Sequence, residues 1–161
     1  DYCLGDGGMT FCSPRTVRTL CCVLLLTVCQ LGLADELTGI VMVEISGLKD
    51  ATGNVYIAVY DSDATWLGDE AVMNKKVVIA ESLDGDLVRT ELQVPLGSYA
   101  LSAFYDKDND GEMDTSFIGM PKEPIALSNN AVAKFGPPSF DDAVFSVGAE
   151  PVIQRMLMRD M

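Results

Sequence analysis

Residues 87–105 read LVRTELQVPLGSYALSAFY, and their pattern is the clearest indication of the fold class. Val88, Leu92 and Val94 occupy alternate positions together with Thr90, and charged or polar side chains stand between them. This period of two is typical of a half-buried β-strand. The turn-forming residues 94–97 (VPLG) lead directly into a second apolar run, residues 98–105. The segment therefore predicts two successive strands joined by a tight turn.

Similar short runs recur along the rest of the chain, separated by clusters of Gly, Asp, Asn and Pro. They cover residues 37–45, 54–60, 76–80, 143–147 and 152–158. About seven strands without a long helical period predict an all-β fold. We expect a single antiparallel β-sandwich, immunoglobulin-like or transthyretin-like, over residues 35–161. Residues 62–74 fit one helical turn, and residues 106–142 form one long acidic loop of a kind that is usually functional or ligand-stabilised.

The N-terminal 34 residues have the pattern of a secretory signal peptide. Arg15 and Arg18 provide the positive region, residues 20–28 are uncharged and apolar, and small residues precede a cleavage position before Asp35. Met9 is the expected natural start, which places residues 1–8 upstream of it. We expect a secreted or periplasmic protein with no stable membrane span after cleavage. The alternative is a leader retained as an N-terminal anchor.

Charge and composition exclude several classes of function. The chain has 11 Lys and Arg against 24 Asp and Glu, a formal net charge of −13, and it has no His. Such an acidic chain lacks the basic surface that nucleic-acid binding requires. Without His there is neither a Ser-His-Asp triad nor a His-ligated zinc site. All five Cys precede Asp35, so the expected mature domain has no thiol and no disulfide.

The acidic loop after the strand at residues 98–105 matches the first nine positions of a calcium-binding loop. Carboxylates stand at positions one, three, five and nine, Gly at six, and the residue at seven offers its backbone carbonyl. Ca²⁺ requires six to eight oxygen ligands, and crowded carboxylates repel one another unless a cation is present. The predicted metal-binding residues are Asp106, Asp108, Asp110, Glu112 and Asp114.

Position twelve of this loop differs from the helix-loop-helix calcium site. Phe117 stands where the bidentate Glu of an EF-hand is expected, and Pro121 follows soon after. We therefore expect a calcium loop embedded in a β-protein. Its ligand shell would be completed by Asp114, by Glu123 or by a carboxylate of residues 141–142.

The order of short motifs through the second half of the chain resembles a known family. These motifs are GSYA (97–100), YDKDNDG (105–111), FIGMPKE (117–123), SNN (128–130) and FGPPSFDDA (135–143). Together they resemble DUF2141, a family of uncharacterised secreted bacterial proteins, over most of residues 37–158. The resemblance implies a secreted β-sandwich and no established activity. Two positions differ: Tyr105 stands where the family commonly has His, and residues 124–127 replace a Gly-Tyr-Gly-Phe-like stretch.

Three functions are compatible with these features, and the sequence favours a non-enzymatic module over an enzyme. The first is a calcium-stabilised extracellular module that binds a protein or glycan partner, with Trp66, Tyr56 and Tyr60 as candidate aromatic contacts. The second is a glycoside hydrolase with Glu123 as acid and Asp141 or Asp142 as its partner. The third is a self-assembling matrix or filament subunit that pairs through the last strand, residues 152–158. No catalytic residue is assigned.

Overall fold

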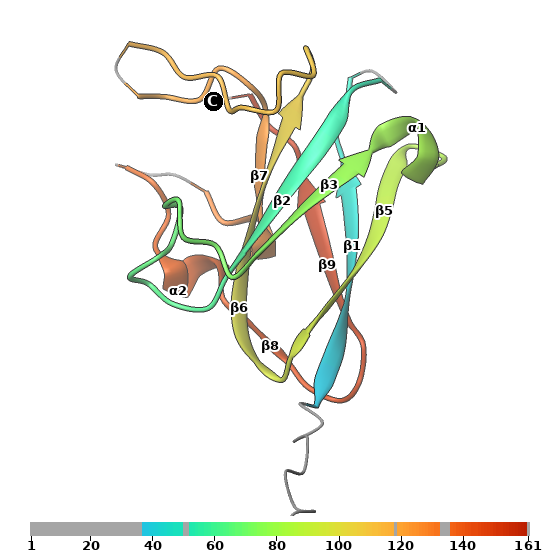
Figure 1. The fold of residues 1–161 in the computed structure, drawn as a ribbon, viewed down its shortest axis with the longest axis vertical. Coiled ribbons are helices and arrows are strands. Elements are labelled where there is room, and N and C mark those ends of the chain that lie inside the picture. Colours follow the sequence, from blue (N-terminus) through green and yellow to red (C-terminus); the bar gives the residue numbers. More distant parts are fainter. Residues whose placement is uncertain (1–36, 50–51, 118, 133–135, 161) are drawn as a thin grey trace, which may run out of the picture. The chain divides into compact units, whose positions relative to one another are not determined.

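The alternating pattern of residues 87–105 forms β5 (Leu87–Pro95) and β6 (Gly97–Asp106) of the computed structural model. The two strands follow one another along the chain but lie in different sheets, so the turn between them crosses from one layer to the other (Figure 1). The structure describes residues 37–49, 52–117, 119–132 and 136–160. The predicted leader, residues 1–34, lies outside the described residues, and so do all five cysteines.

The first sheet has four strands in the order β4-β5-β1-β9. β5 pairs antiparallel with β1, and β1 pairs parallel with β9. The expectation of a purely antiparallel sandwich is therefore wrong at this pair. A parallel pair needs a long connection, and here the rest of the domain provides it. The remaining strands of the sheet are β1 (Thr38–Ser46), β4 (Leu83–Asp84) and β9 (Val152–Leu157).

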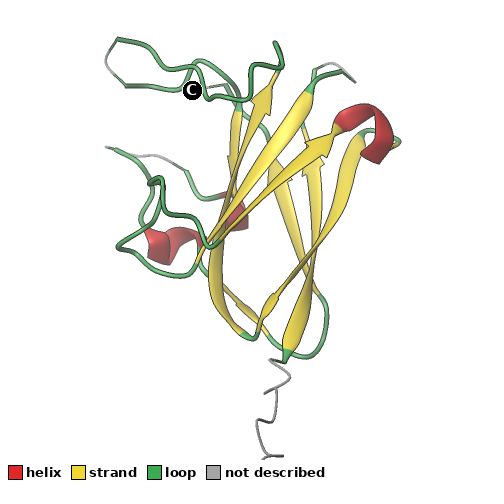
Figure 2. Ribbon diagram, viewed as in Figure 1, coloured by secondary structure: helices red, strands yellow, loops and turns green. Residues whose placement is uncertain are grey.

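The second sheet has five strands, with β3, β2, β6 and β7 in that order and β8 paired with the start of β6. All of its described pairs are antiparallel. The chain is mostly β-structure, with two packed sheets and only short helices (Figure 2). The bounds of the other strands are β2 (Asn54–Tyr60), β3 (Met73–Val78), β7 (Ile125–Leu127) and β8 (Phe145–Val147).

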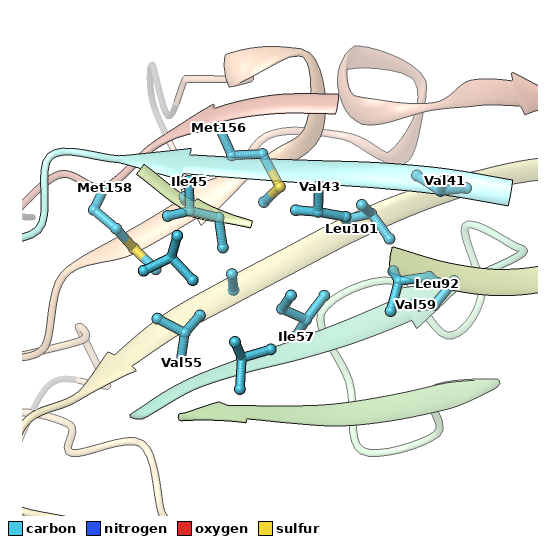
Figure 3. Close-up of a cluster of buried hydrophobic side chains, with 14 of the residues drawn as sticks. Val41, Val43, Ile45, Val55, Ile57, Val59, Leu92, Leu101, Met156 and Met158 are labelled. Carbon is cyan, nitrogen blue, oxygen red and sulfur yellow. The ribbon is translucent and has the colours of Figure 1, made fainter. Parts of the chain in front are cut away.

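The core lies between the sheets and consists of the inward face of each strand. Apolar side chains of β1 and β2 face one another there, with Met156 of β9 beside them (Figure 3). Strand alternation produces this arrangement, because successive side chains point to opposite faces of a sheet. The fully buried side chains include Val41, Val43, Ile45, Val55, Ile57, Val59, Val88, Leu92 and Leu101. Leu37, the first residue of the run expected at 37–45, precedes β1 and is exposed.

Three short helical segments change the expected element boundaries. The strand expected at residues 76–80 ends at Val78, because α1 (Ile79–Ser82) begins there. The strand expected at residues 143–147 begins at Phe145, after α2 (Phe140–Ala143). The long loop expected over residues 106–142 contains β7, the 3₁₀ turn η1 (Ser128–Asn130) and most of α2. The helical turn expected within residues 62–74 forms non-helical turns and bends.

One side of the sandwich is closed by contacts between the two sheets. Ile125 of β7 exchanges two backbone hydrogen bonds with Arg159, just beyond β9. The buried Ser128 hydroxyl accepts from the Leu101 N–H at 2.9 Å and donates to the Ala143 carbonyl at 2.6 Å. The loop after β6 is therefore anchored at its far end. Within the described part of the chain, none of the helices has the length and apolar character needed to cross a bilayer.

Candidate metal centre

Asp106 is the last residue of β6 and the residue around which the acidic loop turns. It is fully buried, and its carboxylate accepts hydrogen bonds from the Asn109 N–H at 2.7 Å and the Gly111 N–H at 3.2 Å. Asn109 and Gly111 have φ values of 64° and 83°, a left-handed conformation that Gly and Asn adopt most readily. The loop therefore coils back over the end of its own strand.

The neighbouring strand β2 supports this coil from the outer face of the sheet. Asn54 lies directly opposite Asp106 in the β2–β6 register, is buried, and donates from its side-chain amide to the Asn109 side-chain oxygen. A Cβ at Gly111 would lie 3.3 Å from the Tyr56 hydroxyl oxygen. Sequence reasoning missed Asn54, because its role depends on cross-strand register. Its only local signal is a polar residue at the start of an apolar strand.

Glu123 reaches the same place from the far end of a short hairpin. The Lys122 N–H donates to the Asp114 carbonyl at 2.9 Å, and Thr115 pairs with Pro121, so residues 114–122 fold back on themselves. The Glu123 carboxylate then accepts hydrogen bonds from the backbone N–H groups of Lys107 and Asp114, each at 3.3 Å. Glu123 thus links the first turn of the acidic loop to the base of the hairpin.

Three carboxylates converge as a result. One oxygen from each of Asp106, Asp108 and Glu123 lies within 4.8 Å of the other two. We call these three residues the carboxylate cluster. Burial raises the pKa of Glu123, and the charges of Asp106 and Asp108 add to this rise, while the N–H groups of Asp114 and Lys107 oppose it. The cluster therefore concentrates negative charge in a partly desolvated position.

The cluster has the donor chemistry of a hard-cation site. Its ligands are carboxylate oxygens, which Ca²⁺ and Mg²⁺ prefer over softer metals. Three carboxylates leave room for the carbonyl and water oxygens with which Ca²⁺ completes six to eight ligands. The residues present therefore fit a calcium ion.

Only two of the five residues predicted from the loop pattern belong to the cluster. Asp106 and Asp108 are in it, whereas Asp110 accepts from the Glu112 N–H at 2.8 Å. Asp114 forms an ion pair with Lys122 at 3.9 Å. The structure places Asp110, Glu112 and Asp114 outside the cluster and brings in Glu123, which the sequence offered as one of several candidates to complete the shell.

The carboxylates suggested as partners of Glu123 in a hydrolase lie on α2. Asp142 completes a capping box with Ser139, whose hydroxyl lies 2.7 Å from the Asp142 carboxylate. Such a box satisfies the exposed N–H groups of a helix start. Among the described residues, neither Asp141 nor Asp142 belongs to the carboxylate cluster.

The candidate aromatic contacts form two packed groups. Trp66 donates from its indole N–H to the Pro138 carbonyl at 2.8 Å and meets Tyr60 and Phe140 edge to face. Tyr56 stacks on Phe104 with ring centroids 5.1 Å apart and an angle of 8° between the rings. Lys76 covers the Tyr56 ring at 5.5 Å. Sugar binding needs open ring faces side by side, whereas Tyr56 and Phe104 cover a face of one another and Trp66 packs edge to face against its neighbours.

A protein-family model matches most of the chain. The family model DUF2141, described as an uncharacterized protein conserved in bacteria, matches residues 43–154, a span that includes the carboxylate cluster. No curated protein and no solved structure matches the chain.

Proposed function

Because the chain belongs to the bacterial DUF2141 family, which is described only as uncharacterized, we propose its function from the site itself. The protein is a secreted or periplasmic, calcium-stabilised β-sandwich module that binds an extracellular partner and is not an enzyme. Calcium is held by Asp106, Asp108 and Glu123. The observation that carries this proposal is the convergence of three carboxylate oxygens within 4.8 Å at the end of β6.

A structural role for the metal is supported by what the carboxylates already contact. Asp106 and Glu123 accept backbone N–H groups from both ends of the acidic loop. A cation bound between them would join β6 to the hairpin at residues 114–122 and would offset charge where the chain, at −13 overall, is most crowded. The ion would therefore stabilise the longest irregular segment of the domain.

The remaining parts of the proposal have separate support. Secretion is supported by the leader pattern of residues 1–34. An immunoglobulin-like or transthyretin-like arrangement is supported by two packed sheets of short alternating strands. A protein partner is favoured over a glycan, because Phe104 and Lys76 cover the Tyr56 ring and Trp66 packs edge to face against Tyr60 and Phe140.

Unfolding with calcium and with a chelator tests the metal site. Native-state binding stabilises a protein by RT ln(1 + [L]/Kd), about 2.7 kcal/mol at a hundredfold excess over Kd. We expect a higher melting temperature in calcium than in chelator, with sodium chloride added to match ionic strength. Magnesium at the same concentration should give a smaller shift, because it requires tighter octahedral geometry.

Asp108→Asn is the most direct variant, because Asp108 is exposed and provides a carboxylate without the loop hydrogen bonds of Asp106. It should weaken calcium binding at least about tenfold through the lower ligand charge. In chelator it should leave the melting temperature no lower than that of the wild type, because it removes one of the mutually repelling charges of the cluster. Asp86→Asn, an exposed carboxylate between β4 and β5, is the matched control. Equal calcium shifts in wild-type, Asp108→Asn and Asp86→Asn protein would contradict the site.

A further inference from the structure

An aromatic side chain stands free at the tip of the hairpin formed by residues 114–122. Phe117 is 100% exposed, and Met113 and Met120 on either side are 40% and 46% exposed. The hairpin is ordered by the Thr115–Pro121 pair and by the Ser116 N–H, which donates to the Met120 carbonyl at 2.7 Å. Phe117 is therefore held outward by defined backbone contacts, and its ring packs against none of the residues that the structure describes.

A cavity that fits such a ring lies on the closed side of the sandwich. Its volume is about 160 Å³, and an apolar cavity of about 150 Å³ accommodates a benzene molecule. The cavity opens to the surface between β7, η1 and the chain just beyond β9. Its lining is mostly apolar, with Ile125, Leu127, Ala131, Val132, Pro138 and Leu157 as the main contributors.

The charges around the ring and around the cavity are complementary. Asp110 and Glu112 are exposed and precede Phe117 along the chain, and we call these two residues the acidic collar. Asp114, which follows them, is already paired with Lys122.

Arg159 and Asp160 both line the cavity. Asp160 is paired with Lys49, whereas within the described residues the guanidinium group of Arg159 forms no ion pair. A ring that entered the cavity would bring the collar toward Arg159.

The tip and the cavity belong to the same end of the domain. The hairpin runs directly into β7, whose Ile125 lines the cavity and exchanges hydrogen bonds with Arg159. The loop after β6 and the C-terminal end of the chain lie together in Figure 1. Two copies related by a two-fold axis can therefore make the contact twice, which is the commonest arrangement in homo-oligomers.

We infer that this face binds a second copy of the chain, with Phe117 of each copy seated in the cavity of the other. The dimer is closed and reciprocal. This contact goes beyond the proposed calcium function and does not require it. It also differs from strand pairing through β9, because it uses the hairpin tip and the cavity.

Sedimentation equilibrium over a wide range of concentrations, in calcium and in chelator, tests the inference on protein purified after expression of the full chain. We expect a monomer–dimer equilibrium. Phe117→Ser should raise the dissociation constant by about a hundredfold, since each of two lost contacts contributes about tenfold. Ala131→Leu, which fills the cavity from inside, should weaken the dimer without touching the tip. Leu83→Ser, 41% exposed on β4, is the control and should leave the dimer unchanged.

Disulfide trapping gives an independent test in a chain whose five N-terminal cysteines are replaced by serine. Phe117→Cys protein mixed with Ala131→Cys protein should give a covalent dimer under oxidation, whereas Leu83→Cys mixed with Ala131→Cys should not.

A monomer at every concentration overturns the inference, and so does a dimer that Phe117→Ser and Ala131→Leu leave intact. The protein could instead assemble into open-ended chains of many copies that both variants weaken. That result would support the contact between Phe117 and the cavity, but it would overturn the closed dimer. If calcium has no effect but the dimer forms, the calcium proposal alone fails.

Discussion

Single residues determine the shape of the carboxylate cluster. The buried carboxylate of Asp106 accepts from Asn109 and Gly111, and both residues lie in the left-handed region of backbone conformation. A side chain at Gly111 would also press on the Tyr56 hydroxyl at 3.3 Å. The acidic loop therefore needs glycine at position 111 for two reasons: glycine adopts a positive φ without strain, and it leaves room for the Tyr56 hydroxyl.

Gly111→Ala tests the role of this position in the site when it is compared with Gly85→Ala. Gly85 also has a positive φ, 64°, but a Cβ there would meet nothing within 4 Å. Both variants should lose about 1 kcal/mol of unfolding free energy through backbone strain. Only Gly111→Ala should also weaken calcium binding, measured by calorimetric titration. Equal calcium affinity in the two variants would show that the contact with Tyr56 does not shape the site.

At the scale of elements, β9 is an edge strand that the Ser128–Asn130 turn covers in part. The Asn130 side-chain amide donates to the Arg155 carbonyl at 3.0 Å and accepts from the Leu157 N–H at 2.8 Å. Exposed strand edges are sites of unwanted pairing, and natural proteins commonly block them. Asn130 therefore occupies part of the strand edge at residues 152–158, through which a self-assembling subunit would pair.

Asn130→Gly removes this cover while keeping a residue that tolerates the positive φ of 51°. The Leu157 amide should then exchange its hydrogen several-fold faster, because a hydrogen bond contributes about 1 kcal/mol to local protection. Hydrogen-exchange NMR measures this change. Asn129→Gly is the matched control, since Asn129 also has a positive φ but donates from its side chain to Val144. Unchanged exchange at Leu157 in Asn130→Gly protein would mean that the strand edge is protected by other contacts.

At the scale of the whole molecule, the net charge and the proposed removal of the leader decide what stabilises the folded domain. Residues 1–34 carry two basic and two acidic residues, so residues 35–161 keep the net charge of −13 and lose all five cysteines. A domain with no disulfide and this much repulsion relies on its core and, in our proposal, on a bound cation. Its stability should therefore respond to calcium as a property of the whole fold.

Expression of the full chain with export in a bacterial host tests the processing step. The exported protein should begin at Asp35, because small residues precede that position and an uncharged apolar segment precedes them. Intact-mass measurement and N-terminal sequencing identify the start. Replacing Ala34 with a bulky residue, Ala34→Leu, should slow cleavage. An exported protein that still carries residues 15–34 would instead identify the segment as a retained anchor.

Much of the fold follows from short-range pattern. Alternation in residues 54–60 and 87–94 predicts both the strands and their inward faces, because side-chain direction in a strand depends only on position along the chain. The two-sheet class follows from the number and spacing of such runs. The acidic loop is also local, since its spacing marks Asp106 and Asp108 as a pair that can face one ion.

The pairing of strands and the third carboxylate were decided only in the tertiary structure. β5 pairs with β1, about fifty residues earlier, and β9 returns parallel to β1. Glu123 lies near Asp106 because the hairpin at residues 114–122 turns the chain back toward the end of β6. Asn54 lies opposite Asp106 because β2 pairs with β6 in that register. The sequence by itself determined where the longer strands lie, which of their faces is buried and where negative charge gathers, because each depends on near neighbours. Partners distant along the chain depend on how all the strands bury their apolar faces at once, and only the folded chain settles that.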